Sequence, residues 1–325
     1  MAHCLVTGGA GFIGAHLVEG LLRRGHQVRV LDDFSTGSHA NIEAVQGQIA
    51  AANLACPLEV VEGSILNQPL LATAMHGIEY VFHKAALASV PFSLREPLLS
   101  NRVNVEGTLC VLLAARDAGV KRLIYAGSSS AYGDHPELPK REDHPTHPLS
   151  PYALAKLAAE HYCRLFTQLY HLETVTLRYF NVFGARQNPD SQYAAVIPKF
   201  ITACLQHQPL PVYGDGQQSR DFTYVDNVVH GNMLAMTAPD VAGKVINLAN
   251  GSRTTLLQLI AYIETFAQQR AQVQFLPPRP GDVLHSQADV SRAQTLLGFE
   301  PLVNVEQGLQ RTLAYYAHSL KASIL

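Results

Sequence analysis

Short apolar runs alternate with longer amphipathic segments through the first half of the chain. The apolar runs have the length of buried strands, and the segments between them repeat their apolar positions with helical spacing. This order is typical of successive β-α-β units, so we predict an α/β fold, a Rossmann-like doubly wound parallel sheet with helices on both faces. Strands are predicted at residues 3–7, 27–31, 58–62, 80–83 and 123–126, and helices at residues 14–24 and 104–118.

The pattern changes near residue 182. Before it, Ser150-Pro151 supplies an N-cap and a first helical position for a long helix that reaches about Tyr170, and residues 174–179 have the pattern of a buried strand. Beyond it, Gly, Pro, Asn and Gln interrupt the sequence as far as Asp221, and residues 245–248 look like a strand that returns to the sheet. We therefore expect a larger domain at residues 1–181, with a returning segment near 221–250, and a smaller mixed α/β domain at residues 182–325.

The composition is that of a compact globular protein. The 325 residues are 47% hydrophobic and 15% charged, with a formal net charge of −2, which excludes disorder as the main state. The 24 basic residues do not exceed the 26 acidic ones, so the chain lacks the positive charge with which proteins hold nucleic acid. No apolar run approaches the length of a membrane span, and no signal-like segment opens the chain. We expect a cytoplasmic protein with neither nucleic acid nor membrane as partner.

A glycine-rich segment lies between the first predicted strand and the first predicted helix. In Gly8-Gly9-Ala10-Gly11-Phe12-Ile13-Gly14, Gly8 permits a tight turn, Gly11 admits a pyrophosphate, and Gly14 allows helix and strand to pack closely. Asp32 follows Gly14 by 18 residues, at the end of the second predicted strand, where a carboxylate binds ribose hydroxyls and repels a 2′-phosphate. We therefore predict NAD as cofactor. Further ribose and adenine contacts are expected from Asp33, Phe34, Ser35, Thr36 and Gly37.

Tyr152 and Lys156 are one helical turn apart on the long predicted helix, so their side chains share a face. A lysine ammonium stabilises a phenolate and lowers the pKa of the phenol, which makes tyrosine a usable base. Ser128 ends the preceding predicted strand, at the edge where open α/β sheets hold ligands, and can hydrogen-bond the same substrate oxygen.

Together these motifs resemble the extended short-chain dehydrogenase/reductase family over essentially the whole chain. The resemblance implies that Ser128, Tyr152 and Lys156 form the catalytic triad, and that Tyr152 and Lys156 also contact the cofactor. It assigns further cofactor contacts to Ser64, Ile65, Lys84, Ala85, Ala86, Asn104 and Phe180. Ser64 departs from the family, in which an aspartate often stands at this position.

The residues after Ser128 restrict the reaction. Family dehydratases carry an Asp-Glu pair there and family decarboxylases a glutamate, whereas this chain has Ser129 and Ser130. Without a further proton-transfer group, the site supports reversible oxidation at one carbon, as in the 4-epimerases. An NAD-sensing regulator on the same fold is the non-enzymatic alternative, and the presence of all three triad residues counts against it.

The second half resembles the sugar-nucleotide epimerases. The resemblance assigns Asn181, Arg220 and Arg279 to the diphosphate, Ala195, Val196, Val212 and Tyr213 to a uracil, and Asp282 to its ribose. Ser89, Ser129 and Ser130 join Ser128 and Tyr152 as further substrate contacts.

Ser286 decides the expected substrate. Epimerases restricted to UDP-glucose typically carry a tyrosine at this position, and a serine leaves room for an N-acetyl group. We expect 4-epimerisation of UDP-N-acetylglucosamine to UDP-N-acetylgalactosamine through a 4-keto sugar, with UDP-glucose and UDP-galactose also accepted. A UDP-hexuronic or N-acetylhexosaminuronic acid 4-epimerase is the alternative, and would need a cation at carbon 6 from Lys84, Arg95 or Lys199.

No metal is expected. The 15 histidines include His135, His144 and His147 in one proline-rich loop, but without a recognised ligand spacing, and the five cysteines are dispersed. The helices predicted at residues 103–118 and 152–170 resemble those of a four-helix dimer interface in the family, which implies a homodimer.

Overall fold

The computed structural model describes residues 1–55, 57–188, 195–278 and 283–322. For Lys321 and Ala322 it describes the backbone alone. Its larger part is a seven-stranded parallel sheet in the order β11-β6-β5-β4-β1-β2-β3. The order reverses beside β1, as the predicted doubly wound fold requires. The strands are β1 (His3–Thr7), β2 (Gln27–Asp32), β3 (Leu58–Glu62), β4 (Tyr80–His83), β5 (Arg122–Ser128), β6 (Glu173–Tyr179) and β11 (Lys244–Leu248).

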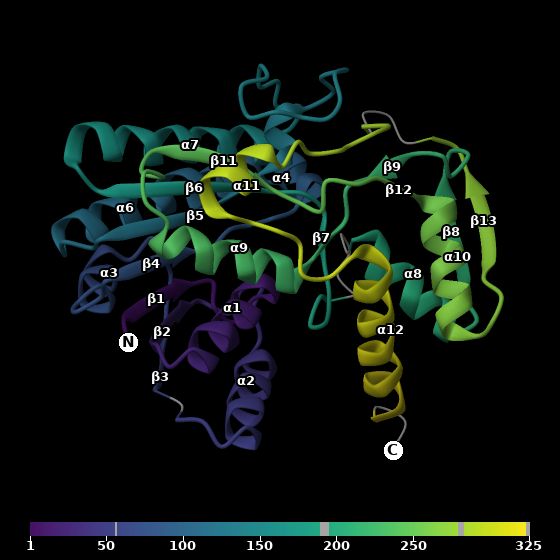
Figure 1. The fold of residues 1–325 in the computed structure, drawn as a ribbon, viewed down its shortest axis with the longest axis horizontal. Coiled ribbons are helices and arrows are strands. Elements are labelled where there is room, and N and C mark those ends of the chain that lie inside the picture. Colours follow the sequence, from purple (N-terminus) through teal and green to yellow (C-terminus); the bar gives the residue numbers. More distant parts are fainter. Residues whose placement is uncertain (56, 189–194, 279–282, 323–325) are drawn as a thin grey trace.

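Helices cover both faces of this sheet (Figure 1), and each face has its own apolar core. One core joins the sheet to α1 (Phe12–Arg23), α2 (His39–Ala51), α9 (Val225–Thr237) and α11 (Ser291–Leu297). The other joins it to α3 (Gln68–Ala74), α6 (Gly107–Asp117) and α7 (Pro151–Tyr170). The α/β class is confirmed, and the strand expected at residues 245–248 is β11, which pairs with β6 at the sheet edge.

A third core lies in the remaining part of the chain, shown to the right in Figure 1. It is formed by α8 (Val196–Leu205), α10 (Leu256–Ala267), α12 (Val305–Ala322) and the strand pair β8 (Pro209–Tyr213) and β13 (Gln272–Leu276). Two short strand pairs complete this part: β7 (Val182–Phe183) with β10 (Thr223–Tyr224), and β9 (Ser219–Arg220) with β12 (Thr254–Thr255). The helix α8 and the strand β8 lie in the interrupted stretch before Asp221, where the sequence pattern predicted no individual element. Prolines hid both elements: Pro198 occupies the first turn of α8, and Pro209 and Pro211 lie in β8, which has a partner on one side only.

The long helix is confirmed as α7, capped where the Ser150 hydroxyl accepts from the Ala153 N–H. The helix expected at residues 104–118 is found at residues 102–117. It begins as a π-helical turn, η1 (Arg102–Glu106), which follows α4 (Val90–Arg95) and α5 (Pro97–Asn101) and continues as α6. The described part of the chain has no helix with both the length and the apolar character that a bilayer crossing requires.

Candidate active site

The glycine segment forms the connection from β1 to α1, and two positions admit no side chain. Gly8 has φ +71°, and a Cβ on it would lie 2.5 Å from the backbone nitrogen of Ala85. A Cβ on Gly14 would lie 2.0 Å from the carbonyl oxygen of Gly8. The helix then begins at Phe12 after Gly11, where no side-chain cap is formed. The first N–H groups of α1 therefore point to a position suited to an anion.

A cavity of about 300 Å³, here called the glycine-loop cavity, opens above this turn. Most of its lining residues lie in or next to the loops after β1, β2, β3 and β4. Predicted cofactor residues in its lining are Gly8, Gly11, Phe12, Ile13, Gly14, Asp32, Asp33, Ser35, Thr36, Ile65, Lys84, Ala85 and Ala86. The prediction missed Leu31, Gly63, Leu87, Ala88, Val103 and Ala126. Most of these are direct neighbours of predicted residues, so continuing each loop by one or two positions would have found them.

Asp32 is buried at the end of β2 and already has backbone donors. Its carboxylate accepts from the N–H groups of Ala10 at 2.8 Å and Phe34 at 2.9 Å. Burial raises the pKa of Asp32, and these two hydrogen bonds oppose the rise. The carboxylate therefore ties the glycine turn to the loop after β2, and it lines the glycine-loop cavity from there.

Some predicted cofactor residues lie outside this lining. The Phe34 ring stacks on His39 with centroids 3.8 Å apart, and the Ser64 hydroxyl accepts from the Leu66 N–H. Gly37 packs against Ala10 and Asp32. The Phe180 side chain is fully buried with Tyr132 and Ala249, so the expected contact of its ring with a nicotinamide finds no support in the structure.

The Asn104 side chain is hydrogen-bonded to Leu87, in the loop after β4 that lines the glycine-loop cavity. Its side chain accepts from the Leu87 N–H at 2.8 Å and donates to the Leu87 carbonyl at 3.1 Å. This pair of bonds holds the segment after β4 in place. Next to it, buried His83 lies between the hydroxyls of Thr7 at 2.7 Å and Thr108 at 2.9 Å. Asn104 is thus a positioning residue for the cavity wall, although the resemblance assigned it to the cofactor directly.

The three predicted catalytic residues converge where β5 ends and α7 begins. Ser128 is the last residue of β5, and its hydroxyl is hydrogen-bonded at 2.7 Å to the hydroxyl of Ser130. Tyr152 is also anchored by its backbone N–H, which donates to the Ser93 hydroxyl at 3.1 Å. Lys156 is buried one turn further along α7, with Nζ 4.7 Å from the centre of the Tyr125 ring.

The pKa of Tyr152 differs from the expectation. Burial raises it, and the hydrogen bond from Ser128 is the opposing contact, whereas the sequence argument expected Lys156 to lower it. The reason is geometric, because the Lys156 ammonium lies over Tyr125. Burial lowers the pKa of Lys156 itself to about 8. The isolated chain therefore holds the phenol in its neutral form.

Lys84 lines the glycine-loop cavity, but its amino group is engaged inside the fold. Nζ donates to the Tyr179 hydroxyl at 2.9 Å and to the Ile124 carbonyl at 3.3 Å. Burial and the nearby Lys156 hold the pKa of Lys84 well below its usual range. Of the three cations considered for carbon 6, Lys84 is therefore unsuited to hold a carboxylate.

A second cavity of about 370 Å³, here called the small-domain cavity, lies between the end of β6, α8 and β8. Among the predicted substrate residues, Asn181, Ala195, Val196, Tyr213 and Arg220 line it. The prediction missed the apolar walls Val182, Phe183, Ile197, Phe200, Phe222 and Leu256, and also Gln218 and Lys199, which had been weighed only for carbon 6. The assignment of Val212 to the uracil site is wrong. Side chains alternate along a strand, so Pro211 and Tyr213 face the cavity while Val212 is fully buried in the third core.

The remaining predicted substrate residues are dispersed. Ser286 donates its N–H to the Ser219 carbonyl at 3.0 Å, which places it beside β9 and Arg220. The Ser89 hydroxyl caps α4 by accepting from the Phe92 N–H. Ser129 and Ser130 form the turn after Ser128. Arg279 and Asp282 lie outside the described residues.

Asp221 was predicted only as the end of an irregular region, yet it joins three segments next to Arg220. Its buried carboxylate accepts from the N–H groups of Asn250, Gly251 and Ala288, at 3.0 to 3.1 Å. Its carbonyl accepts from the Asn181 side chain at 3.1 Å. Burial raises the pKa of Asp221 to about 7. A lone Asp after an Arg has no spacing that reveals these long-range contacts, so the sequence could not identify it.

Comparison with known proteins identifies the family. Residues 4–249 match the model of the NAD dependent epimerase/dehydratase family. The chain belongs to this family. Among solved structures, UDP-glucose 4-epimerase from Thermotoga maritima, determined with UDP-glucose, is 37% identical with a TM-score of 0.90, covering 98% of this chain and 99% of that one.

Two further solved structures of the family differ in the sugar that they act on. UDP-N-acetylglucosamine 4-epimerase from Methanobrevibacter ruminantium, in complex with UDP-N-acetylmuramic acid, is 37% identical with a TM-score of 0.91, covering 98% and 99% of the two chains. UDP-glucuronic acid 4-epimerase from Bacillus cereus, in complex with UDP-glucuronic acid and NAD, is 33% identical with a TM-score of 0.88 and the same coverage. The fold is thus common to 4-epimerases of neutral, N-acetylated and acidic UDP-sugars.

Proposed function

We propose that the protein is an isomerase that interconverts UDP-N-acetylglucosamine and UDP-N-acetylgalactosamine by NAD-dependent 4-epimerisation, and that it also accepts UDP-glucose and UDP-galactose. The observation that carries the reaction type is the meeting of Ser128, Tyr152 and Lys156 where β5 ends and α7 begins, with Lys156 one helical turn from Tyr152. Ala126, two residues before Ser128, lines the glycine-loop cavity. Strand β5 therefore contributes to this cavity and to the catalytic residues.

The glycine-loop cavity fits NAD. The N-terminus of α1 suits its diphosphate, and Asp32 offers a carboxylate to the adenosine ribose. NAD, when bound, accepts the hydride from carbon 4 of the sugar and returns it. The chain's own part is to move the hydroxyl proton: Tyr152 takes it from the 4-hydroxyl group and later gives it back, while Ser128 orients the oxygen. Because burial raises the pKa of Tyr152, the base needs added positive charge nearby, and a nicotinamide cation meets that need.

The turn after Ser128 supports epimerisation over dehydration. Ser129 and Ser130 occupy the positions where dehydratases carry an acid and a base, and the Ser130 hydroxyl is bonded to Ser128. A hydroxyl with an ordinary high pKa does not remove a proton from carbon. The 4-keto sugar is therefore expected to turn within the site and receive hydride on its other face.

The small-domain cavity supports a UDP-sugar as substrate. It carries two cations, Arg220 and Lys199, beside the amide of Asn181, which suits a diphosphate, and its walls include Tyr213 and Phe200. For an N-acetyl group, the support is the small side chain of Ser286 next to β9. A UDP-hexuronic acid is the alternative, favoured by the likeness to the Bacillus cereus enzyme, and Lys199 is the cation in this cavity that such a substrate would use.

Two structural proposals accompany this function. Residues 1–181, with the segment near 221–250, would bind NAD, and residues 182–325 would bind the UDP-sugar. The homodimer would form through α6 and α7, and exposed Leu154, Leu165 and Leu169 on α7 support an apolar contact there.

A substrate panel tests the proposal. Purified protein without added NAD is incubated with UDP-glucose, UDP-N-acetylglucosamine and their uronic acids, and NMR follows the axial and equatorial protons at carbon 4. We expect the N-acetylated and neutral sugars to reach equilibrium and the acids to remain unchanged. Conversion of the acids alone would favour the alternative, and a stoichiometric requirement for added NAD would contradict internal hydride return.

A further inference from the structure

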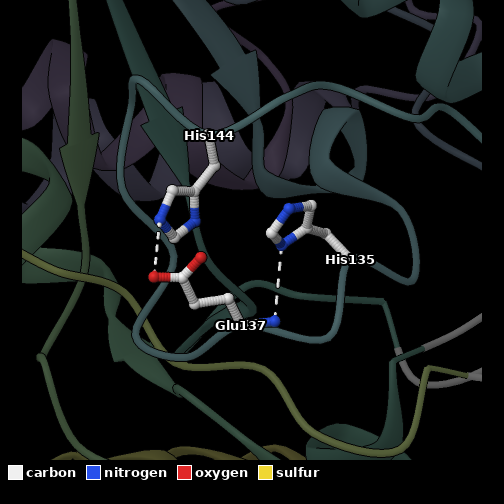
Figure 2. Close-up of side chains that lie close together, drawn as sticks. All are labelled: His135, Glu137 and His144. Atoms are coloured by element: carbon white, nitrogen blue, oxygen red, sulfur yellow. Dashed lines mark hydrogen bonds and ion pairs between the residues drawn. The ribbon is translucent and has the colours of Figure 1, made fainter.

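Three side chains with metal-ligating atoms meet in the loop between Ser128 and α7, outside both cavities. They are His135, Glu137 and His144, and their ligand atoms lie within 4.8 Å of one another (Figure 2). The Nε2 atom of His144 is 3.5 Å from a carboxylate oxygen of Glu137. The two imidazole rings are stacked, with centroids 5.0 Å apart. The sequence argument expected no metal because His135, His144 and His147 have no recognised ligand spacing. It did not consider Glu137, which the fold of the loop brings to two of these histidines.

We propose that His135, Glu137 and His144 form a binding site for one divalent transition-metal ion of the Zn²⁺ class. Two imidazoles and a carboxylate are a ligand set that zinc takes in proteins, with water in the fourth position. Bonds of about 2.0–2.2 Å in a tetrahedron place ligand atoms about 3.3 Å apart. The pair of Glu137 and His144 already has this separation. His135 lies within 4.8 Å of the other ligand atoms, so it must approach by at most about 1.5 Å, and the side chain of Glu137 is exposed.

The surrounding loop supports a cation at this place. Residues 133–149 contain four acidic and two basic residues, so the loop is negatively charged. Hydrogen bonds of Lys140, which lies between Glu137 and His144 in the chain, hold the loop in place. Its ammonium donates to the His135 carbonyl. Its N–H donates to the Gln287 carbonyl at 2.7 Å, and its carbonyl accepts from the Asp289 N–H at 2.8 Å. The side chain of His144 is only 9% exposed. A part of the site is therefore preorganised.

The ring nitrogens set a limit on affinity. Nδ1 of His135 accepts from the Glu137 N–H at 3.4 Å, and Nδ1 of His144 accepts from the Arg141 N–H at 3.3 Å. A neutral ring that accepts at Nδ1 has its proton on Nε2, so a metal at Nε2 requires these two long contacts to be given up. Sites whose rings donate to an acceptor are favoured by about 10–100-fold over sites without that support. The proposed site is therefore weaker than a structural zinc site, and occupancy moves the loop that joins Ser128 to Tyr152.

Zinc titration tests the proposal directly. The full-length protein is freed of metal with a chelator, and Zn²⁺ is added in competition with a chromophoric chelator. We expect one equivalent per chain, and Co²⁺ in its place should give the intense visible absorption of a tetrahedral site. His135→Ala and Glu137→Gln should each weaken binding at least tenfold. The four described cysteines, Cys4, Cys110, Cys163 and Cys204, are buried and do not compete.

His147→Ala is the matched control, because His147 lies in the same loop but pairs with Asp134 at 3.0 Å. The His147→Ala variant should still bind one equivalent of Zn²⁺ per chain. A circular dichroism melt of each variant establishes that it is folded, and His135 and Glu137 are substituted in preference to His144 because His144 is nearly buried. The absence of Zn²⁺ binding, equal binding in His135→Ala, or loss of binding in His147→Ala would each overturn the proposal.

Discussion

The glycine-loop cavity and the small-domain cavity are built in different ways. The first is lined by consecutive residues of a few loops, and close backbone approaches such as Gly8 to Ala85 define its shape. The second collects residues from β7, α8, β8 and β9, which are separated along the chain. A site made of contiguous backbone leaves a local motif in the sequence, whereas a site made of dispersed side chains does not.

This difference explains how much could be predicted. Strands β1 to β6 and helix α7 follow from apolar periodicity, and the glycine segment follows from its spacing. Val212 was assigned to the wrong side because strand β8 was not recognised, and without the strand its alternation was unknown. The contacts of Asp221 span up to 67 residues and depend on the packing of three segments. The cluster of His135, Glu137 and His144 likewise depends on the path of one loop.

Removal of the phenol hydroxyl is expected to have the largest effect. Tyr152→Phe should lower turnover by about 10²–10⁴-fold because it removes the proton acceptor. Binding of NAD should be unchanged, since Tyr152 does not line the glycine-loop cavity. Steady-state kinetics and the absorbance of protein-bound nucleotide measure the two effects. Turnover equal to that of the unaltered protein would exclude Tyr152 as the base.

Gly14→Ala tests the backbone-built cavity. The added Cβ would lie 2.0 Å from the Gly8 carbonyl, so the turn must shift. We expect a loss of about 1–3 kcal/mol in the free energy of unfolding and loss of bound NAD. Gly47→Ala is the control, because its Cβ meets nothing within 4 Å and it lies inside α2, where alanine should add about 0.5–1 kcal/mol. Chemical denaturation compares the pair, and retention of NAD by Gly14→Ala would refute the close-packing argument.

Ser286→Tyr tests the side-chain-built site. The larger side chain should reduce kcat/KM for UDP-N-acetylglucosamine about tenfold or more, while UDP-glucose serves as the internal control and changes little. A parallel loss for both sugars would show that Ser286 does not face the 2-substituent.

The pH dependence centres on Lys156, whose pKa burial lowers to about 8. Above that pH Lys156 loses its positive charge one helical turn from Tyr152, so a phenolate formed during turnover has less cationic support and kcat/KM should fall. The free energy of unfolding changes with pH in the opposite direction to kcat/KM. The unfolded chain binds the extra proton up to its ordinary pKa of 10.5, so the contribution of this group to the free energy of unfolding rises between pH 8 and that value. Lys156→Arg keeps its charge and should move the activity limb upward, and an unmoved limb would assign it to another group.

The fate of the hydrogen at carbon 4 tests the central claim most directly. UDP-N-acetylglucosamine labelled with deuterium at carbon 4 is converted in ordinary water, and NMR or mass spectrometry measures the label in the product. Hydride transfer and return within one site predict that the label stays at carbon 4 through many turnovers. Loss of the label to solvent would contradict the mechanism.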